Sequence, residues 1–398
     1  MRFALIADAF PPLRTSGAVQ LRDLSQEFTR QGHEVIVMIA APDLDVAWRI
    51  DRYGDVTALR LKSPRTRDIG YVRRTAAEFL MPIAMLRNYR RSPLAGTAFD
   101  GIIWYSPTIF LAPIVNALKR ESNCRAYLII RDIFPQWAAD MGLMARGLPY
   151  QALERIARRQ YATADIIGVQ TPGNLAFLDS AAAGNHGARL EVLHNWLSEV
   201  GSGRCSINLT AGPLAGRKIF VYAGNMGVAQ GMDKLIDLAG RLKDREDIGF
   251  LFVGRGSDTK RLACKARRRS LTNVLFHDEI DPDEIPGLYA QCHVGLVSLD
   301  PRHKTHNIPG KFLSYMQVGL PVLASVNPGN DLISLIEERG VGRVSVDPSG
   351  ADLLGAALSL LADIALGNDM PNRCKALSKA MFTSAAAVSQ IVAALGAV

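Results

Sequence analysis

The residues best suited to bind a ligand lie at 307–322, where a polar loop leads into a short helix and then a strand. Pro309 suits a first helical turn, because its missing N–H costs nothing there, and Gly319 is placed to end the helix. A helix start directs free backbone N–H groups outward, and Lys311 adds a positive charge beside them. The run therefore predicts a phosphate-binding site; the alternative is an ordinary surface turn before a helix.

Three further segments at strand ends have the composition of anion-binding loops. Residues 8–17 are polar and contain a glycine, residues 224–231 are bracketed by glycines, and residues 252–256 place an arginine between two glycines. Backbone N–H groups can bind phosphate in such loops, although a turn glycine or an exposed arginine explains each segment equally simply. The Gly-x-Gly-x-x-Gly dinucleotide fingerprint is absent. The candidate ligand-binding residues are Ser16, Gly17, Gly224, Asn225, Gly227 and Arg255.

The composition is that of an ordinary globular protein with an excess of positive charge. The chain has 398 residues, of which 48% are hydrophobic and 21% charged, and this length suggests two or three domains. The formal net charge of +8 favours an anionic partner such as a nucleotide, a lipid headgroup or a nucleic acid. The five cysteines are far apart and form no Cys-x-x-Cys pair, which argues against a disulfide framework or a zinc site.

Alternating strand-like and helical runs predict an α/β fold with two doubly wound, Rossmann-like lobes. The first apolar run, Phe3–Ala7, is too short for a signal peptide and is expected to be a buried strand. A Ser106–Pro107 pair is expected to start a helix. The expected strands are Phe3–Ala7, Glu34–Ile39, Gly101–Trp104, Ala126–Ile130, Ile166–Val169, Leu190–Leu193, Ile219–Tyr222, Phe250–Val253, Val274–Phe276, Val294–Val297, Val322–Ala324 and Gly342–Val344.

The predicted domains are a first lobe over 1–197, a linker over 198–216, a second lobe over 217–374 and a C-terminal segment over 375–398. Within that last segment, Lys375 to Leu395 is expected to be one helix that packs back on the first lobe. Ligands of open α/β sheets bind beyond the carboxyl ends of the strands, so the loops described above are where chemistry is expected.

The 307–322 run resembles the donor-binding motif of retaining nucleotide-sugar glycosyltransferases of family 4, which have the GT-B fold. It is similar to a bacterial surface-polysaccharide subgroup that carries Ile-Pro-x-Lys and then a Tyr-Met pair, here Ile308 to Met316. Where most of the family has two glutamates, this chain has His306 and Ser314. The resemblance therefore leaves Lys311 as the better candidate for contact with a diphosphate.

The same resemblance suggests roles for residues elsewhere. Gly17 matches a family glycine beside the donor diphosphate, and the segment ending at Ile280 matches one that holds the nucleotide base through backbone groups. Arg131 and Asp132 stand where many relatives have a His-Asp pair near the acceptor. Asp132 would accept the proton of the attacking sugar hydroxyl; the alternative is an aspartate that caps the next helix.

The implied activity is transfer of a sugar, with retention, from a nucleotide diphosphate donor to a lipid-linked saccharide. UDP is the expected nucleotide, a deoxy amino sugar such as N-acetyl-L-fucosamine the expected group, and undecaprenyl diphosphate the expected lipid carrier. No cofactor and no metal are expected, and O-antigen, capsule or exopolysaccharide synthesis is the expected context. The alternatives are a nucleotide-sugar 2-epimerase of the same fold and a non-enzymatic nucleic-acid-binding protein, for which no basic and aromatic reading surface is evident.

A last feature is the stretch Lys62 to Arg91, in which eight basic residues flank an apolar segment. Basic flanks around apolar side chains suit an anionic membrane surface, and relatives act on lipid-linked sugars. We therefore expect a cytoplasmic enzyme that is peripheral on the inner face of the cell membrane. The alternative is a solvated helical region.

Overall fold

The computed structural model describes residues 1–13, 15–67, 69–181, 187–198, 203–302, 304, 306 and 308–396. Asn307 of the predicted phosphate-binding run and residues 199–202 of the predicted linker lie outside these ranges. The chain divides into two compact units, which are described separately. Unit 1 comprises Met1–Ser198 with Ser384–Val398, and unit 2 comprises Glu199–Thr383.

Unit 1 contains an eight-stranded sheet in the order β3-β4-β2-β1-β5-β6-β7-β8, parallel except for β3, which is antiparallel to β4. Strands such as β5 and β7 are buried on both faces, as parallel strands between two helical layers must be. The strands are β1 (Arg2–Ala7), β2 (Glu34–Ala41), β3 (Trp48–Tyr53), β4 (Val56–Lys62), β5 (Gly101–Ser106), β6 (Arg125–Ile130), β7 (Ile166–Val169) and β8 (Arg189–Val192).

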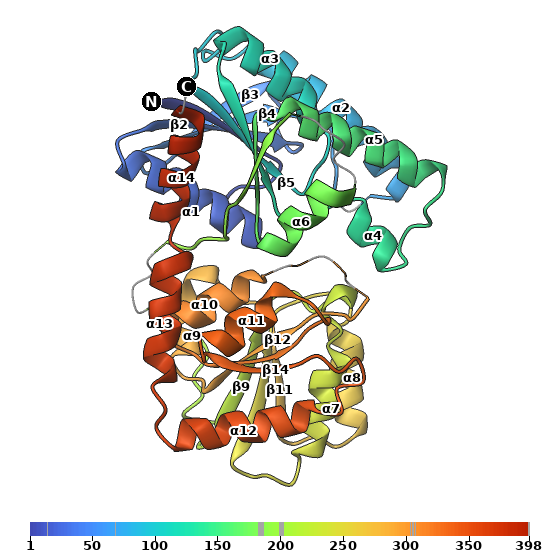
Figure 1. Ribbon diagram of the computed structural model, residues 1–398, viewed down its shortest axis with the longest axis vertical. Coiled ribbons are helices and arrows are strands. Elements are labelled where there is room, and N and C mark those ends of the chain that lie inside the picture. Colours follow the sequence, from blue (N-terminus) through green and yellow to red (C-terminus); the bar gives the residue numbers. More distant parts are fainter. Residues whose placement is uncertain are drawn as a thin grey trace. The chain divides into compact units, whose positions relative to one another are not determined.

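Helices cover both faces of this sheet (Figure 1). Helix α1 (Ser16–Arg30) and helix α14 (Ser384–Gly396) pack on one face, where Leu395 lies so close to Gly101 that a Cβ there would be 2.8 Å from its Cδ1. The opposite face carries α2 (Tyr71–Tyr89), α3 (Ala112–Ser122), α5 (Leu148–Thr163) and α6 (Pro172–Ala181). A short helix, α4 (Gln136–Asp140), follows β6.

Unit 2 contains a six-stranded parallel sheet in the order β11-β10-β9-β12-β13-β14. Its central strands are wholly apolar or nearly so, and aromatic rings such as those of Phe220 and Phe250 stack within the core, with centroids 5.1 Å apart. The strands are β9 (Lys218–Ala223), β10 (Ile248–Val253), β11 (Val274–His277), β12 (Val294–Ser298), β13 (Val322–Ser325) and β14 (Gly342–Ser345).

Helices α7, α8 and α12 pack on one face of the second sheet, and α10 packs against β12, α9 and α13 (Figure 1). The helices of unit 2 are η1 (Val228–Gln230), α7 (Asp233–Arg241), α8 (Thr259–Arg268), η2 (Pro282–Glu284), α9 (Ile285–Tyr289), α10 (Gly310–Val318), α11 (Asp331–Glu338), α12 (Leu353–Ala365) and α13 (Met370–Met381).

All twelve predicted strands are present, so the predicted fold class is confirmed, but three local predictions are wrong. Residues 375–395 form parts of two helices rather than one: α13 packs on α10 in unit 2, and α14 packs on α1 in unit 1. The Ser106–Pro107 pair does not begin a helix, because β5 continues through Ser106 and α3 begins at Ala112. Pro309 is the N-cap of α10 rather than a residue of its first turn.

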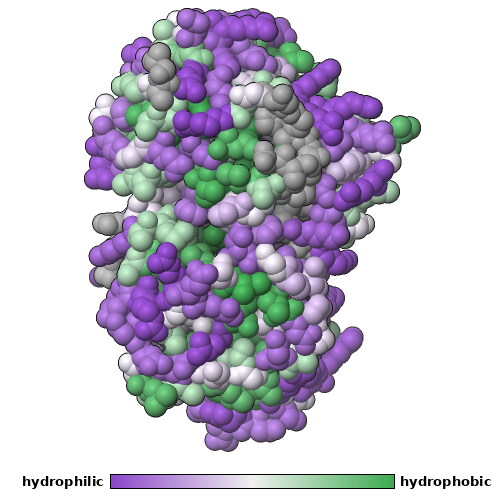
Figure 2. All heavy atoms as spheres, in the orientation of Figure 1, coloured by the Kyte–Doolittle hydropathy of each residue, from purple (hydrophilic) through white to green (hydrophobic). Residues whose placement is uncertain are grey.

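Hydrophilic residues cover most of the face shown in Figure 2, with smaller hydrophobic patches between them. Among the described residues, no single helix has both the length and the apolar composition needed to cross a membrane. Helices α12 and α13 meet these criteria only as a pair, which is bent by 102°.

Candidate active site

The topology of unit 2 predicts where a ligand binds. The chain runs outward from β9 to β10 and β11, then returns to β12 on the other side of β9, so the strand order reverses between β9 and β12. Ligands of such sheets bind at this switch point, beyond the carboxyl ends of the strands. The loop after β9 and the start of α10, which follows β12, are the elements concerned.

The loops after β9 and β10 pack backbone against backbone, and only glycine permits this. A Cβ at Gly254 would lie 2.2 Å from Gly224 O, and a Cβ at Gly256 would lie 2.2 Å from Met226 O. The Met226 N–H also donates to Arg255 O at 2.8 Å. Gly224 itself has φ 134°, a conformation that L side chains rarely adopt. The sequence folds here into a closely packed double loop.

Lys311 reaches this double loop from the first turn of α10. A Cβ at Gly224 would lie 3.6 Å from Lys311 Cε and 3.9 Å from Lys311 Nζ, so the ammonium group lies over the loop. Nζ is also 4.4 Å from the centroid of the Tyr222 ring, an attractive cation–π geometry. Within the described residues no carboxylate pairs with Lys311, and burial lowers its pKa to about 8. A positive charge without a counter-ion is therefore available to an anionic ligand.

The backbone at the start of α10 adds hydrogen-bond donors. Its N-cap is Pro309, which has no side-chain cap, and Phe312 N–H donates to Pro309 O at 2.9 Å. Gly310 and Lys311 therefore carry first-turn amides that an α-helix cannot satisfy internally. Two amides, a helix dipole and an ammonium group at one point form a site suited to phosphate.

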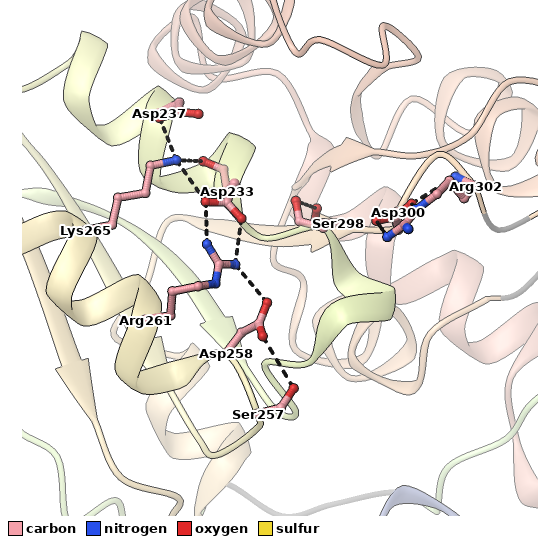
Figure 3. A network of polar contacts seen from close by, with 10 residues as sticks. Asp233, Asp237, Ser257, Asp258, Arg261, Lys265, Ser298, Asp300 and Arg302 are labelled. Atoms are coloured by element: carbon pink, nitrogen blue, oxygen red, sulfur yellow. Dashed lines mark hydrogen bonds and ion pairs between the residues drawn. The ribbon is translucent and has the colours of Figure 1, made fainter. Parts of the chain in front are cut away.

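Ion pairs hold the segment that follows Gly256 (Figure 3). Arg261 donates to Asp233 at 2.9 and 2.7 Å and to Asp258 at 2.8 Å, and Lys265 also reaches Asp233. The hydrogen bonds from Arg261 lower the Asp233 pKa to about 2. The Asp258 N–H donates in turn to Met226 O at 3.0 Å, which connects this network to the double loop.

A second pair in the same view fixes the segment after β12. Arg302 donates to both oxygens of Asp300 at 2.9 Å, and these bonds lower the pKa of Asp300 (Figure 3). The Asp300 N–H donates to Ala229 O at 3.0 Å. Both charge networks thus hold loops in place rather than offering free charge.

The other residues predicted in unit 2 lie around the same loops. Asn225 donates to Gln230 Oε1 at 3.4 Å, and the Gly227 N–H donates to the same oxygen at 3.0 Å. Arg255 is largely exposed and forms an ion pair with Glu279 at 3.0 Å. Its charge is therefore partly balanced, unlike that of Lys311.

His306 and Ser314, which stand where the resembled family has two glutamates, have other contacts. His306 Nδ1 lies 3.3 Å from Asp331 Oδ2, and Ser314 donates to Gly310 O within the helix at 3.4 Å. Ile308 is buried, and Ile280 is partly buried after β11, where the His277 carbonyl accepts from Gly254 N–H at 3.0 Å. Among the described residues, no group of three or more His, Cys, Asp or Glu could hold a metal ion.

Unit 1 has its own switch point between β1 and β5, and a buried arginine lies at the neighbouring strand. Arg131 follows β6, is 5% exposed, and has its guanidinium 4.3 Å from the Trp196 ring centroid. It donates to Leu193 O at 3.3 Å, yet its Nε and Nη2 have no hydrogen-bond partner within the described residues. Burial lowers its pKa. Tyr105 and Asp132 both interact with this guanidinium, so the three residues form one polar group at the carboxyl ends of β5 and β6.

The remaining predicted residues of unit 1 occupy the same sheet edge. Asp132 follows Arg131 and is partly buried, while Ser16 and Gly17 begin α1, whose N-cap is Thr15. A Cβ at Gly17 would lie 3.4 Å from the Tyr105 ring. Charged and polar groups from the ends of β1, β5 and β6 therefore come together in unit 1.

Several residues of these sites were not predicted from the sequence. Tyr222 lies under Lys311, and its hydroxyl donates to Asn225 O at 2.7 Å. In unit 1, Tyr105 donates to Gln20 Oε1 at 3.0 Å, and Trp196 donates to Gln20 O at 2.7 Å. The tyrosines stand within apolar strands, where the sequence suggests only core packing.

Tyr222→Phe is expected to lower the affinity for UDP, the nucleotide that the sequence resemblance implies, about 3- to 10-fold. Asn225 O would lose its donor, and a neutral hydrogen bond contributes about 0.5–1.5 kcal/mol. Isothermal titration with UDP measures the change. Tyr315→Phe is the matched control, because its buried hydroxyl lies 3.0 Å from Val221 O and 3.2 Å from Leu296 O in the core, either of which can accept its one proton. If both variants bound UDP as the wild type does, Tyr222 would have no role in the loop.

Comparison with known proteins agrees with this architecture. Residues 217–363 match the family described as "Glycosyl transferases group 1". The chain is 25% identical over 351 residues to a protein of Escherichia coli (strain K12) named "Putative colanic acid biosynthesis glycosyl transferase WcaI", covering 82% of this chain and 84% of that one.

Solved structures show the same fold across the whole chain. A sucrose-phosphate synthase from Thermosynechococcus elongatus superposes with a TM-score of 0.78 at 15% identity, covering 98% of this chain and 97% of that one. Anabaena HepE in complex with UDP and glucose superposes with a TM-score of 0.70 at 14% identity, covering 99% of each chain. The fold is therefore GT-B, and the matches identify the protein as a glycosyltransferase.

Proposed function

We propose that the protein transfers a sugar from a UDP-sugar to a hydroxyl of a lipid-linked saccharide during synthesis of a bacterial surface polysaccharide. The observation that carries the proposal is the ammonium of Lys311 over the Gly224 loop, which has no ion-pair partner among the described residues and lies beside the first-turn amides of α10. The UDP and glucose bound to Anabaena HepE, and the colanic acid named for WcaI, support the donor and the context.

Unit 2 is assigned the donor diphosphate. In the reaction the bond between the anomeric carbon and the diphosphate oxygen breaks, and negative charge develops on the departing UDP. Lys311 and the amides of Gly310 and Lys311 are placed to stabilise that charge without reorganising. Arg255, although paired with Glu279, can add a second contact.

Unit 1 is assigned the acceptor hydroxyl. The acceptor oxygen forms the new bond to the anomeric carbon, and Asp132 takes up its proton directly or through a water molecule. Arg131 Nε and Nη2, for which no hydrogen-bond partner is found in the described part of the chain, can donate to ligand oxygens beside it. The resemblance to retaining enzymes favours transfer with retention, and a deoxy amino sugar such as N-acetyl-L-fucosamine as the transferred group.

Thermal unfolding with nucleotides tests the donor assignment. UDP at 100 times its Kd should stabilise the protein by about 2.7 kcal/mol, because it binds only the folded state. ADP, GDP and CDP at the same concentration serve as comparisons. If no nucleoside diphosphate raised the melting temperature, unit 2 would not be a donor site.

Helix α2 supports a membrane surface as the place of reaction. Phe79, Leu80 and Ile83 are each more than half exposed on one face of this helix. Arg74 is paired with Glu78 at 2.8 Å, and Arg90 with Glu121 at 2.6 Å. The exposed arginines on or beside the same helix that form no ion pair within the described residues are Arg73, Arg87 and Arg91. Exposed apolar side chains among unpaired cations suit the interface of an anionic bilayer.

Replacing Arg73, Arg87 and Arg91 by serine is expected to weaken binding to anionic vesicles about 100-fold. Each basic residue near such a surface contributes about 1 kcal/mol, and the attraction is screened by salt. Co-sedimentation with vesicles of phosphatidylglycerol and phosphatidylcholine measures the loss of vesicle binding.

The matched control replaces Lys260, Arg267 and Arg268 of the other unit by serine, which removes the same charge from an exposed helix. It should leave vesicle binding nearly unchanged. Equal loss in both triple variants would mean that net charge, rather than α2, attracts the protein to the vesicle.

A further inference from the structure

Unit 1 contains a cavity of about 270 Å³ that the proposed function does not use. Ile133 and Phe134, which directly follow Asp132 in the sequence, both line it. The remaining walls come from the start of α4, from α5 and from Leu178 of α6. The segment that follows β6 and Asp132 therefore supplies one wall of the cavity.

The inner part of the cavity is apolar and aromatic. Ile133, Ala157 and Leu178 are buried and carry no polar side-chain atoms. Tyr150 and Tyr161 are both buried and add two aromatic rings. They lie on one side of α5, because they are eleven residues, or about three helical turns, apart. Aromatic faces carry partial negative charge and attract the polarised C–H groups of a ligand.

The rim is polar but its charges are already balanced. Arg146 forms an ion pair with Asp140 at 2.9 Å, and Arg158 one with Glu154 at 3.5 Å. At the same edge, Tyr150 donates to Gln136 Oε1 at 2.8 Å. A phosphate at this rim would meet a carboxylate for each guanidinium, so a neutral ligand with hydroxyl or amide groups fits better.

We propose that this cavity binds the terminal sugar of the acceptor, and that the sugar carries an apolar substituent such as a 6-deoxy methyl or an N-acetyl group. The inference rests on the proposed function and names the acceptor of the same reaction. A sugar ring has C–H faces for the tyrosines and hydroxyls for the rim, while the substituent fills the apolar inner part. A prenyl chain would use the apolar surface but would make no hydrogen bonds with the polar side chains that line the rim, Gln136, Arg146 and Glu154.

Saturation-transfer NMR on the full-length protein tests this inference, because it detects the weak binding expected of one sugar. The probes are methyl fucoside, methyl N-acetylglucosaminide and methyl glucoside, with geranyl phosphate as the lipid-like rival. The first two should receive at least threefold more saturation than methyl glucoside, with the strongest transfer to the 6-methyl or N-acetyl protons. Binding of geranyl phosphate without any glycoside would overturn the inference in favour of a lipid.

Two variants connect the signal to the cavity. Ala157→Phe fills the inner part and should reduce saturation of the glycosides at least tenfold, whereas Ala152→Phe adds the same side chain at an exposed position of α5 and should not. Gln136→Leu removes a partly exposed rim amide and should weaken binding without disturbing the core, which covers the case that Ala157→Phe does not fold. Unchanged saturation in Gln136→Leu and in folded Ala157→Phe would place the sugar elsewhere.

Titration with UDP on the same samples separates this inference from the donor proposal. If the wild type bound UDP but no glycoside, the cavity assignment would be wrong and the donor site would stand. If it bound glycosides in the cavity but no nucleoside diphosphate, the acceptor site would stand and the donor assignment would fail.

Discussion

Lys311→Ala is expected to lower kcat about 10²- to 10³-fold and to weaken UDP binding. Lys311 is the one charged group placed over the Gly224 loop for which no counter-ion is present among the described residues. Loss of a preorganised donor to a developing negative charge costs about 2–4 kcal/mol of transition-state stabilisation. Steady-state kinetics with the UDP-sugar identified by thermal unfolding measure it.

The pH dependence of UDP binding tests the role of Lys311 independently. Burial lowers the Lys311 pKa to about 8, so the free protein loses this charge as the pH rises through 8. UDP keeps its charge over that range, because its phosphate ionises near pH 6. Affinity should therefore be highest below pH 8 and fall up to tenfold per pH unit above it.

Lys311→Arg and Lys243→Ala are the controls. Arginine stays protonated, so the Arg variant should bind UDP with little change between pH 7 and 9. Lys243 is exposed, and its removal should alter neither kcat nor the pH profile. A pH profile in Lys311→Ala identical to that of the wild type would assign the titration to another group.

The sequence was sufficient to predict the sheets because their strands are buried between two helical layers. β5 and β10, for example, are buried throughout and appear as short apolar runs between turn residues. The β3–β4 hairpin was not predicted. β3 is an edge strand with charged residues such as Arg49 and Asp51, and β4, although it lies inside the sheet, has an apolar run interrupted by Arg60. Edge strands carry less of the hydrophobic signal on which such predictions depend.

The site was only partly predictable, for a different reason. Lys311 could be recognised because the residues that indicate its role are neighbours in the sequence, at the start of α10. The role of Tyr222 could not, because it depends on a cation–π contact with a residue 89 positions later in the chain. The buried guanidinium of Arg131, stacked on Trp196, likewise depends on residues brought together from two different strand ends. Contacts of this kind have no local pattern in a sequence.

The break between α13 and α14 illustrates the same limit. Periodicity over residues 375–395 indicates helix, and both segments are helical. The interruption after Met381 follows from packing. The Phe382 ring meets the Phe312 ring of α10 edge-on, with the ring centroids 6.1 Å apart. The Ser384 N–H donates instead to Leu197 O in unit 1. Two helices are needed because each packs on a different unit.

Asp132→Asn is expected to reduce kcat about 10²- to 10⁴-fold while leaving UDP affinity unchanged. Asparagine has nearly the same shape but cannot accept the acceptor proton, and general base catalysis contributes about this factor. A purely structural role predicts a different outcome. Asp132 does not cap α4, because the N-cap of that helix is Pro135. If Asp132 does not stabilise the fold, the variant should melt within a few degrees of the wild type.

Asp55→Asn provides the matched control, because Asp55 is an exposed carboxylate in the same unit. Its kcat and melting temperature should equal those of the wild type. Normal turnover in Asp132→Asn would remove Asp132 from the mechanism. A large fall in melting temperature together with proportionate losses in UDP affinity and kcat would instead identify it as a structural residue. Loss of kcat alone, with UDP still bound, is the outcome we expect, because Asp132 follows β6 at the sheet edge to which the acceptor is assigned.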